Sequence, residues 1–325
     1  MKKLNSKTSL ILIIVVFIIV LGAVFFILIK NTTPELKWFE DYETAREYAI
    51  KTNKQIFLFF DGSSWNETSS QLRTDILDKE EFLSIAGSNF VPVRLDIPLD
   101  DGQTEFTEQQ NKNLELASIF AIPEIPTILI LTVNNQVYDT IEYVPSGTTL
   151  QSMKTALDNT MEKARVISLL NQKLNSSSGE ERVRIIDELV SITPQDYIFQ
   201  FYNLINTVPE LDPTNKTGLV GKYMLIITHV DALEKFFNGD VAGAAESYAE
   251  TACNNLLTAD EKLEAYYKAA TMCYYGGLNE QLKDYLAKAI ASSPDSENAA
   301  VLQNTLNSFI ADEQASQSNQ ESEQK

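Results

Sequence analysis

Two cysteines and a single histidine are the residues of this chain best suited to nucleophilic or redox chemistry. Cys253 and Cys273 could form one disulfide or a reactive pair in an exported protein. They lie on separate predicted helices rather than on a shared loop, which does not favour the fast exchange of a close pair. Alanines and aromatic residues accompany both, so two buried free thiols are an equally good expectation. His229 has no cysteine or histidine beside it, and we expect a packing residue rather than a ligand.

Hydroxyl and carboxyl groups gather in residues 61–69. Thr68 and Ser69 have no histidine base nearby, and Ser69 is better explained as a cap for free N–H groups at a helix start. Asp61 and Glu67 could form an acid pair, but nothing in the sequence places them at a common cleft. The acids between residues 96 and 102 lack the alternating oxygen spacing of a calcium loop. We therefore expect no catalytic residue, no metal site and no cofactor.

An uninterrupted apolar run from residue 10 to residue 29 follows Lys2, Lys3 and Lys7. As a helix it would be about 30 Å long, which is enough to cross a bilayer. Apolar residues continue past the only small-residue stretch, so we expect an uncleaved anchor rather than a cleaved signal peptide. The lysines before the run, against Lys30 alone after it, predict a single-pass protein with a cytoplasmic N-terminus. The bulk of the chain would be extracytoplasmic, and periplasmic if the source has two membranes.

The formal net charge of the chain is −19. Because the first thirty residues hold four lysines and no acid, the remainder carries −23. Such a surface disfavours anionic lipid headgroups, and we expect no nucleic-acid partner. Protein partners with basic or apolar surfaces are more compatible with it.

Strand and helix patterns alternate between residue 35 and about residue 162. Gln55–Phe60 is a short apolar run typical of a central strand with both faces covered. The other predicted strands are Phe90–Ile97, Ile128–Thr132 and Val137–Tyr143, and the predicted helices are Glu43–Asn53, Glu67 to about Ile85, Gln109–Phe120 and Thr149–Met161. This order predicts an α/β sandwich with helices on both faces of the sheet.

The loop after the first strand reads Asp61-Gly62-Ser63-Ser64-Trp65-Asn66-Glu67-Thr68-Ser69. With the later segments Asn89–Ile97 and Ile122–Leu131, it resembles the thioredoxin family, in particular exported members with a Gly-Ser-x-Trp-Cys-x-x-Cys loop. The best anchors are Trp65 and the tripeptide Ile125-Pro126-Thr127, whose proline would match the family's cis-proline. The resemblance implies a thioredoxin-like fold for this segment.

In that family the loop carries a nucleophilic and a resolving cysteine, and the preceding strand carries a buried acid that accepts a proton from the resolving thiol. The resemblance places Asn66, Ser69 and Phe59 at these three positions. An amide cannot attack a disulfide, so the joint loss implies that the loop has no redox activity. The retained Trp65 and the edge at residues 125–127 imply a surface where a peptide could pair.

Residues 163–311 lack strand signals and show amphipathic helical periods. Ala232, Gly239, Ala244 and Tyr248 recur 38 residues later as Ala270, Gly277, Leu282 and Leu286. Small residues at helix crossings and a glycine at the turn are typical of tetratricopeptide repeats, and the segment resembles one or two degenerate repeats of that family. Helical hairpins of another origin would give the same pattern. Helices at Glu181–Phe201 and Leu219–Phe237 would complete the stack.

The sequence therefore predicts four segments: residues 1–30 as a cytoplasmic stub and membrane anchor, 31–162 as a thioredoxin-like domain, 163–311 as an all-α, tetratricopeptide-like domain, and 312–325 as a disordered tail.

The leading functional hypothesis is a membrane-anchored adaptor or chaperone-like scaffold, not an enzyme, whose thioredoxin-like domain has become a protein-binding surface. A second hypothesis is a thiol-disulfide redox protein of the cell envelope that uses Cys253 and Cys273. A third is a structural assembly factor without a peptide groove.

Overall fold

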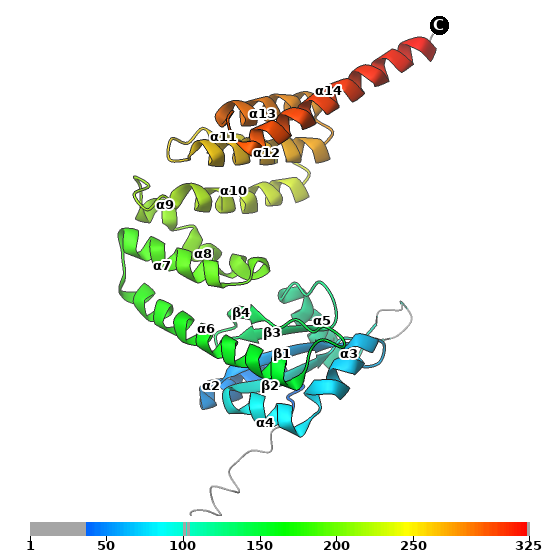
Figure 1. The fold of residues 1–325 in the computed structure, drawn as a ribbon, viewed down its shortest axis with the longest axis vertical. Helices are drawn as coiled ribbons and strands as arrows, with labels where there is room; N and C mark the ends of the chain where they lie inside the picture. Colours follow the sequence, from blue (N-terminus) through cyan, green and yellow to red (C-terminus); the bar gives the residue numbers. More distant parts are fainter. Residues whose placement is uncertain (1–36, 100–101, 103–104, 324–325) are drawn as a thin grey trace, which may run out of the picture. The chain divides into compact units, whose positions relative to one another are not determined.

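The computed structural model describes residues 37–99, 102 and 105–323, with side chains as far as Ala311. The chain divides into two compact units (Figure 1). The α/β unit extends to Asn135 and includes Thr140–Asn159, whereas the helical unit contains Gln136–Asp139 and Thr160–Lys325. A thioredoxin-like α/β domain followed by a large helical region is the architecture that the sequence predicts.

A four-stranded sheet has the order β2-β1-β3-β4, and its first three strands form the centre of the α/β unit (Figure 1). The strands are β1 (Gln55–Asp61), β2 (Phe90–Asp96), β3 (Thr127–Leu131) and β4 (Val137–Thr140). β1 pairs in parallel with β2 and antiparallel with β3. Its side chains from Ile56 onward are buried, as expected for a central strand with both faces covered.

The two faces of β1 pack against different aromatic side chains. Phe59 contacts Trp38 on one face, with ring centroids 6.2 Å apart, and Phe60 contacts Phe120 on the other, also at 6.2 Å. Because successive side chains of a strand point to opposite faces, Asp61 continues the face of Phe59. The strand therefore ends with a carboxylate on the face where Phe59 packs against Trp38.

The first four helices of the α/β unit differ from the sequence prediction mainly at one break. They are α2 (Tyr42–Thr52), α3 (Glu67–Leu72), α4 (Glu80–Asn89) and α5 (Glu108–Ile119). The segment predicted as one helix from Glu67 to about Ile85 is interrupted, because α3 passes into a π-helical turn, η1 (Arg73–Leu77), and α4 starts afterwards. Arg73 at this junction is paired with Asp61, a long-range contact that the local pattern does not reveal.

Helix α6 (Leu150–Ser176) is one continuous helix of 27 residues. The boundary expected between residues 162 and 163 therefore falls inside a helix rather than in a linker. The reason is local: no glycine or proline occurs between residues 150 and 176, so nothing in the sequence breaks the helix. The compact units divide near Asn159 instead.

The helical unit continues through short and long helices. These are α7 (Gly179–Ile192), η2 (Gln195–Phe201), α8 (Tyr202–Ile205), α9 (Val208–Leu211), α10 (Val220–Phe237), α11 (Val241–Ala252), α12 (Ala259–Tyr275), α13 (Asn279–Ser292) and α14 (Glu297–Glu323). The last five follow one another as neighbouring helices (Figure 1).

Two consecutive hairpins, α10–α11 and α12–α13, are built by the same turn. Gly239 and Gly277 both have positive φ, +86° and +68°, which glycine adopts without a steric penalty. The N–H of Gly239 donates to Phe236 O, and the N–H of Gly277 donates to Tyr274 O, 38 residues further along. The sequence offset therefore corresponds to a structural repeat of the helix-turn-helix unit.

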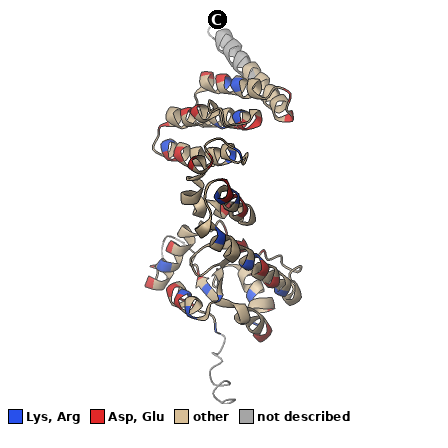
Figure 2. Cartoon of the chain, turned by 90° about the vertical axis from the view of Figure 1, so that its left-hand side faces the viewer, with Lys and Arg blue, Asp and Glu red and all other residues tan. Residues whose placement is uncertain are grey.

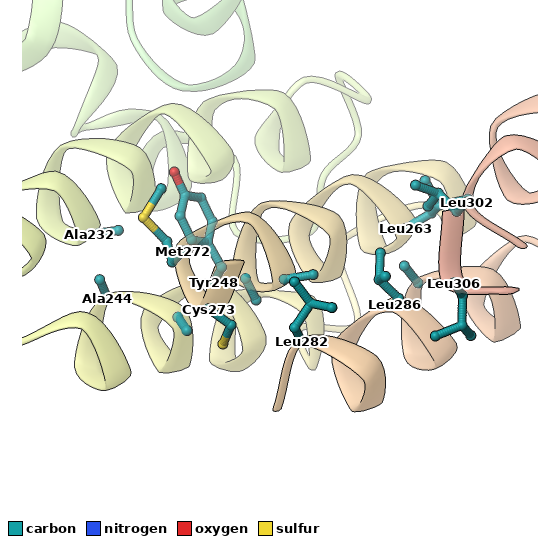
Figure 3. Close-up of a cluster of buried hydrophobic side chains, with 14 of the residues drawn as sticks. Ala232, Ala244, Tyr248, Leu263, Met272, Cys273, Leu282, Leu286, Leu302 and Leu306 are labelled. Atoms are coloured by element: carbon teal, nitrogen blue, oxygen red, sulfur yellow. The ribbon is translucent and has the colours of Figure 1, made fainter. Parts of the chain in front are cut away.

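The side chains matched by this offset form the core of the hairpins (Figure 3). Ala232 and Ala270 are buried, as are the pairs Ala244 with Leu282 and Tyr248 with Leu286. Leu302 and Leu306 of α14 pack against the same cluster, so α14 covers the end of the helix array. The cluster contains both small and large residues, and such a mixture lets neighbouring helices interlock.

Helix α14 runs to Glu323 and so includes most of the segment expected to be disordered from residue 312. That segment is rich in Glu and Gln, which have high helix propensity, and contains no glycine or proline. Low sequence complexity therefore led to the wrong expectation for its backbone.

The expected membrane anchor at residues 10–29 lies outside the described residues. Within residues 37–99, 102 and 105–323, no helix has both the length and the hydropathy required to cross a membrane. Acidic residues are spread over helices of both units (Figure 2).

Candidate functional site

The loop between β1 and α3 is held by a tight turn at Gly62. The N–H of Asn66 donates to Gly62 O at 2.8 Å, and α3 begins at the following residue. The Asn66 Oδ1 atom accepts from the N–H of Ser69 at 2.8 Å, so Asn66 is the N-cap. The expectation that Ser69 caps the helix is wrong, because Ser69 lies three residues inside the capped turn.

The other end of the Asn66 side chain crosses to the segment before β3. Its Nδ2 atom donates to Ile125 O at 2.9 Å. The Ile125–Pro126 peptide bond is cis, as the resemblance implies. Thr127 starts β3 and donates its hydroxyl to Glu124 O at 2.7 Å. One backbone acceptor of the expected peptide-binding edge is therefore already bonded within the domain.

Ser69 is fully buried behind the loop. Its Oγ atom accepts from the N–H of Gly62 at 3.2 Å, which ties the start of the loop to the first turn of α3. At this position the hydroxyl holds the loop in place and faces away from solvent. Both residues at the expected cysteine positions, Asn66 and Ser69, thus have their polar atoms in structural hydrogen bonds.

Trp65 lies at the surface of the same loop and is 39% exposed. Its indole Nε1 donates to Ile97 O at 2.8 Å, which fixes the ring against the end of β2. Gly62 has no space for a side chain, because an added Cβ would lie 2.7 Å from the Asn66 Cβ and 3.0 Å from the Trp65 ring. The sequence motif therefore produces a rigid loop with one exposed aromatic face.

Asp61 is the site residue that the sequence analysis undervalued. Its carboxylate is fully buried and lies 3.4 Å from Arg73 Nε and 3.7 Å from Arg94 Nε. Burial raises the pKa of Asp61, whereas Arg73, Arg94 and the Ser69 hydroxyl lower it. The strand before the loop therefore does carry a buried acid, two residues beyond Phe59.

Phe59 itself belongs to the aromatic core and contacts no loop residue by its ring pairs. The position assigned to the family's acid by the resemblance is thus offset from the buried carboxylate observed. Successive side chains of a strand point to opposite faces, so Asp61 lies on the same face as Phe59, and this period of two is the signal that sequence reasoning could have used. The missing thiols distinguish this loop more clearly than a missing acid. Glu67, the suggested partner of Asp61 in an acid pair, is only the first residue of α3.

A depression of about 260 Å³ is lined by residues next to the loop. They are Glu40, Ser63, Arg94, Asp96, Thr107, Gln109, Gln110 and Asn113. Several of these groups bond to one another: the Ser63 N–H donates to Asp96, and Gln109 donates to Asn113. Within the described part of the chain, no three His, Cys, Asp or Glu side chains are grouped to hold a metal ion.

The two cysteines are free thiols in different surroundings. Cys253 is exposed, with its Sγ 3.7 Å from the Tyr266 hydroxyl, whereas Cys273 is fully buried in the core of the hairpins (Figure 3). Burial raises the pKa of the Cys273 thiol, which is opposite to the shift that makes a thiol reactive. The expectation of two buried thiols holds only for Cys273.

His229 is a packing residue, as expected. Its Nδ1 is hydrogen-bonded to the Tyr248 hydroxyl, and its ring contacts Phe199. Burial, followed by the nearby charge of Lys268, lowers the pKa of the imidazole.

Comparison with known proteins separates the same two regions. Residues 37–132 match a family described as Thioredoxin-like, and residues 219–315 match a family described as Uncharacterised protein C-terminal domain. An uncharacterized protein of Treponema pallidum (strain Nichols) is 20% identical over 268 residues, which cover 81% of this chain and 85% of that protein. Both regions therefore occur together in at least one relative.

Two Chlamydia pneumoniae proteins match the first region. Thioredoxin-related protein DsbJ is 30% identical over 103 residues, 32% of this chain but only 29% of that protein. A solved structure described as DsbH Oxidoreductase is 26% identical and covers 37% of this chain and 81% of its own, with a TM-score of 0.33. Disulfide bond reductase DsbH is 30% identical over 123 residues, covering 37% of this chain and 72% of the reductase. Through this match and residues 37–132, the chain belongs to the thioredoxin-like family.

Proposed function

We propose that this chain is a membrane-anchored, extracytoplasmic thioredoxin-like protein that performs no thiol exchange and serves as a protein-binding adaptor or chaperone-like scaffold. The observation that carries the proposal is the use of Asn66 and Ser69. At the two positions where thiols would act, their polar side chains bond to the loop and to Ile125.

These bonds make the replacements part of the domain's structure. The Asn66 amide caps α3 with its oxygen and reaches Ile125 O with its nitrogen, so both ends of the group are engaged. Ser69 is buried and accepts from Gly62. A substrate disulfide would meet an amide at the loop surface, and an amide is not a nucleophile under physiological conditions.

The binding surface that we propose on this domain consists of Trp65 and the adjoining segment Ile125-Pro126-Thr127. Trp65 presents an exposed aromatic face on a fixed loop, and aromatic side chains of this kind are frequent interface anchors. Because Ile125 O already accepts from Asn66, strand pairing through that atom would require the amide to move. We therefore assign recognition to the side chains rather than to backbone pairing.

The helical unit is proposed to carry a second binding surface on degenerate tetratricopeptide-like repeats. The matching turns at Gly239 and Gly277 and the buried residues at equal offset support this assignment. A relative similar over 81% of the chain supports a joint role for the two regions. The anchor at residues 10–29 and the cytoplasmic N-terminus belong to the same proposal.

The alternative of a redox pair formed by Cys253 and Cys273 has less support. A reactive thiol needs partial exposure and a lowered pKa, whereas Cys273 is fully buried and its pKa is raised. The Chlamydia pneumoniae relative is nevertheless named as a disulfide bond reductase, which is a reason to test reductase activity directly.

A reductase assay with the purified full-length chain and an insulin substrate tests the proposal. We expect no activity from the native chain and none from the double variant Cys253→Ser with Cys273→Ser. Activity that persists in the double variant would contradict the proposal, and activity that disappears with both cysteines would favour the redox alternative.

A photo-crosslinking amino acid at position 65 tests the binding surface. We expect a discrete adduct with one identified protein, and no such adduct from a matched probe at Ile50, an exposed apolar position on α2. Equal adducts from both positions, or none from position 65, would favour the structural assembly factor instead.

A further inference from the structure

Two helices of the helical unit each end in a pair of aromatic residues. Phe236 and Phe237 are the last two residues of α10, and Tyr274 and Tyr275 are the last two of α12. The two pairs are 38 residues apart, the same offset that relates the turns at Gly239 and Gly277. The repeat therefore preserves an aromatic pair in front of each turn, in addition to the residues of its core.

The four rings form one continuous surface. Phe236 contacts Phe237 at a centroid distance of 5.8 Å and Tyr275 at 6.3 Å, and Tyr275 contacts Tyr274 at 5.7 Å. All three pairs are close to edge-on, the arrangement that aromatic rings prefer. Phe236 also packs against the buried core of the hairpins, which anchors the surface to the fold. We call Phe236, Phe237, Tyr274 and Tyr275 the aromatic patch.

The exposure of the aromatic patch is not explained by the hairpins themselves. Phe237 is 80% exposed, Tyr275 68% and Tyr274 62%, so these side chains contribute little to the core. The turns are made by backbone hydrogen bonds and glycine conformation, neither of which needs an aromatic neighbour. Contiguous exposed aromatic side chains are typical of interaction surfaces.

The charged residues next to the aromatic patch in the sequence are mainly acidic. Residues 231–240 contain Asp231, Glu234 and Asp240 against Lys235, and Lys235 is paired with Asp231 at 3.0 Å. After the second turn Glu280 is paired with Lys283 at 2.7 Å. Glu234 and Asp240 are both exposed, and Asp240 caps α11 through the Gly243 N–H. The rim of the patch therefore carries net negative charge.

We propose that the aromatic patch binds a basic segment of a partner protein in which arginine or lysine side chains alternate with apolar ones. The cations would lie against the exposed ring faces and near Glu234 and Asp240, while the apolar side chains cover Phe237 and Tyr275. This inference rests on the proposed adaptor function and identifies a surface and partner chemistry for its helical unit. A second copy of the chain would carry the same net charge of −19, and the two copies would repel each other. The same repulsion disfavours anionic lipid.

Fluorescence anisotropy with the purified full-length chain and a short labelled peptide of alternating arginine and leucine tests the proposal. We expect saturable binding that weakens as salt is raised, and no binding of the same peptide with glutamate in place of arginine. The double variant Phe237→Ala with Tyr275→Ser should bind roughly tenfold or more weakly, the size of a hot-spot truncation.

Two matched controls separate the patch from general effects. Tyr267→Ser changes an exposed tyrosine of the same helix outside the patch, and should bind like the native chain. Asp240→Asn with Glu234→Gln removes the rim charge while an asparagine retains the cap of α11, and should weaken binding and reduce its salt dependence. Thermal unfolding of each variant verifies that the fold is retained.

Equal binding by the native chain and the Phe237, Tyr275 double variant would overturn the proposal, as would binding of the glutamate peptide or of neither peptide. Sedimentation that shows a dimer lost in the same variant would overturn it in favour of a second copy as occupant. Variant-sensitive binding to phosphatidylcholine vesicles would overturn it in favour of a membrane. None of these outcomes involves disulfide reduction, so the failure of this inference remains distinct from failure of the redox-silent function.

Discussion

The loop before α3 and the turns before α11 and α13 all lead the chain into a helix, but different contacts hold them. The loop depends on partners distant in sequence: Asn66 bonds to Ile125, and Trp65 bonds to Ile97. The hairpin turns depend on backbone bonds that span only a few residues around Gly239 and Gly277. A site held by distant contacts can lose its chemical groups and keep its shape, whereas a site held locally can be copied along the chain.

The largest effect is expected where the loop rests on the core of the α/β unit. Phe59→Asp should destabilise the unit by about 4 kcal/mol or more, because it removes a fully buried ring and places a carboxylate against Trp38. Phe59→Leu, which stays apolar, should lose about 1 kcal/mol. Chemical denaturation followed by tryptophan fluorescence measures both. Equal stability of the Asp variant and the native chain would show that position 59 accepts the family's acid after all.

Gly62→Ala tests the steric side of the comparison. Its Cβ would meet the Asn66 Cβ at 2.7 Å and Ile125 at 3.1 Å, so the loop must shift, at a cost of about 2 kcal/mol. The N–H of Asn66 should then show faster hydrogen exchange. An unchanged denaturation midpoint would mean that the loop is less tightly held than its contacts indicate.

Asn66 itself separates capping from the bond to Ile125. Asn66→Ala removes both and should cost about 1.5 kcal/mol. Asn66→Asp keeps the cap acceptor but cannot donate to Ile125 O, so its loss should be smaller, about 0.5–1 kcal/mol. Denaturation of the two variants under identical conditions gives the comparison. If the aspartate variant loses as much stability as the alanine variant, the bond to Ile125 accounts for most of the effect and capping for little of it.

Gly239→Ala and Gly277→Ala test whether the two hairpin turns are equivalent. Both positions have positive φ and open space around an added Cβ, so each substitution should cost about 1 kcal/mol through backbone conformation alone. Far-UV circular dichroism during thermal unfolding is the measurement. A large difference between the two would break the structural repeat at the level of energetics.

The smallest effect is a dependence on pH at Asp61. Burial raises its folded-state pKa above the ordinary value of 3.8, so on acidification the folded chain takes up this proton before the unfolded chain does. Stability relative to Asp61→Asn should therefore be greatest below the ordinary pKa and should be lost as the pH rises through the raised pKa. Denaturation of both chains from acidic to neutral pH measures the difference. A difference that grows toward neutral pH would mean that the two arginines outweigh burial.

The elements of the α/β unit were largely predictable because their signals are local. The apolar run at Gln55–Phe60 and the segment Phe90–Ile97 correspond to β1 and β2 within one residue. The break after α3 was not predictable, since the helical pattern continues through Arg73 while the ion pair with Asp61 is formed across the fold.

The same distinction applies to the candidate site. The Ile125–Pro126 bond could be assigned from the motif, but the bond from Asn66 to Ile125 O joins residues 59 positions apart and has no sequence signature. Asp61 was visible as an acid in the sequence. Its ion-pair partners Arg73 and Arg94, however, come from two other elements. In the helical unit the aromatic pairs lie at the repeat offset, so sequence alone could have identified them; their exposure required the structure.

The positions of the tryptophans give the α/β unit a spectroscopic signal of its own. The chain has two tryptophans, Trp38 among the aromatic side chains of the core and Trp65 on the loop, and both lie in the α/β unit. Intrinsic tryptophan emission therefore reports on that unit alone, while the far-ultraviolet signal is dominated by the long helices of the other. Comparing the two unfolding curves in one unmodified sample would reveal whether the units lose structure together or in sequence.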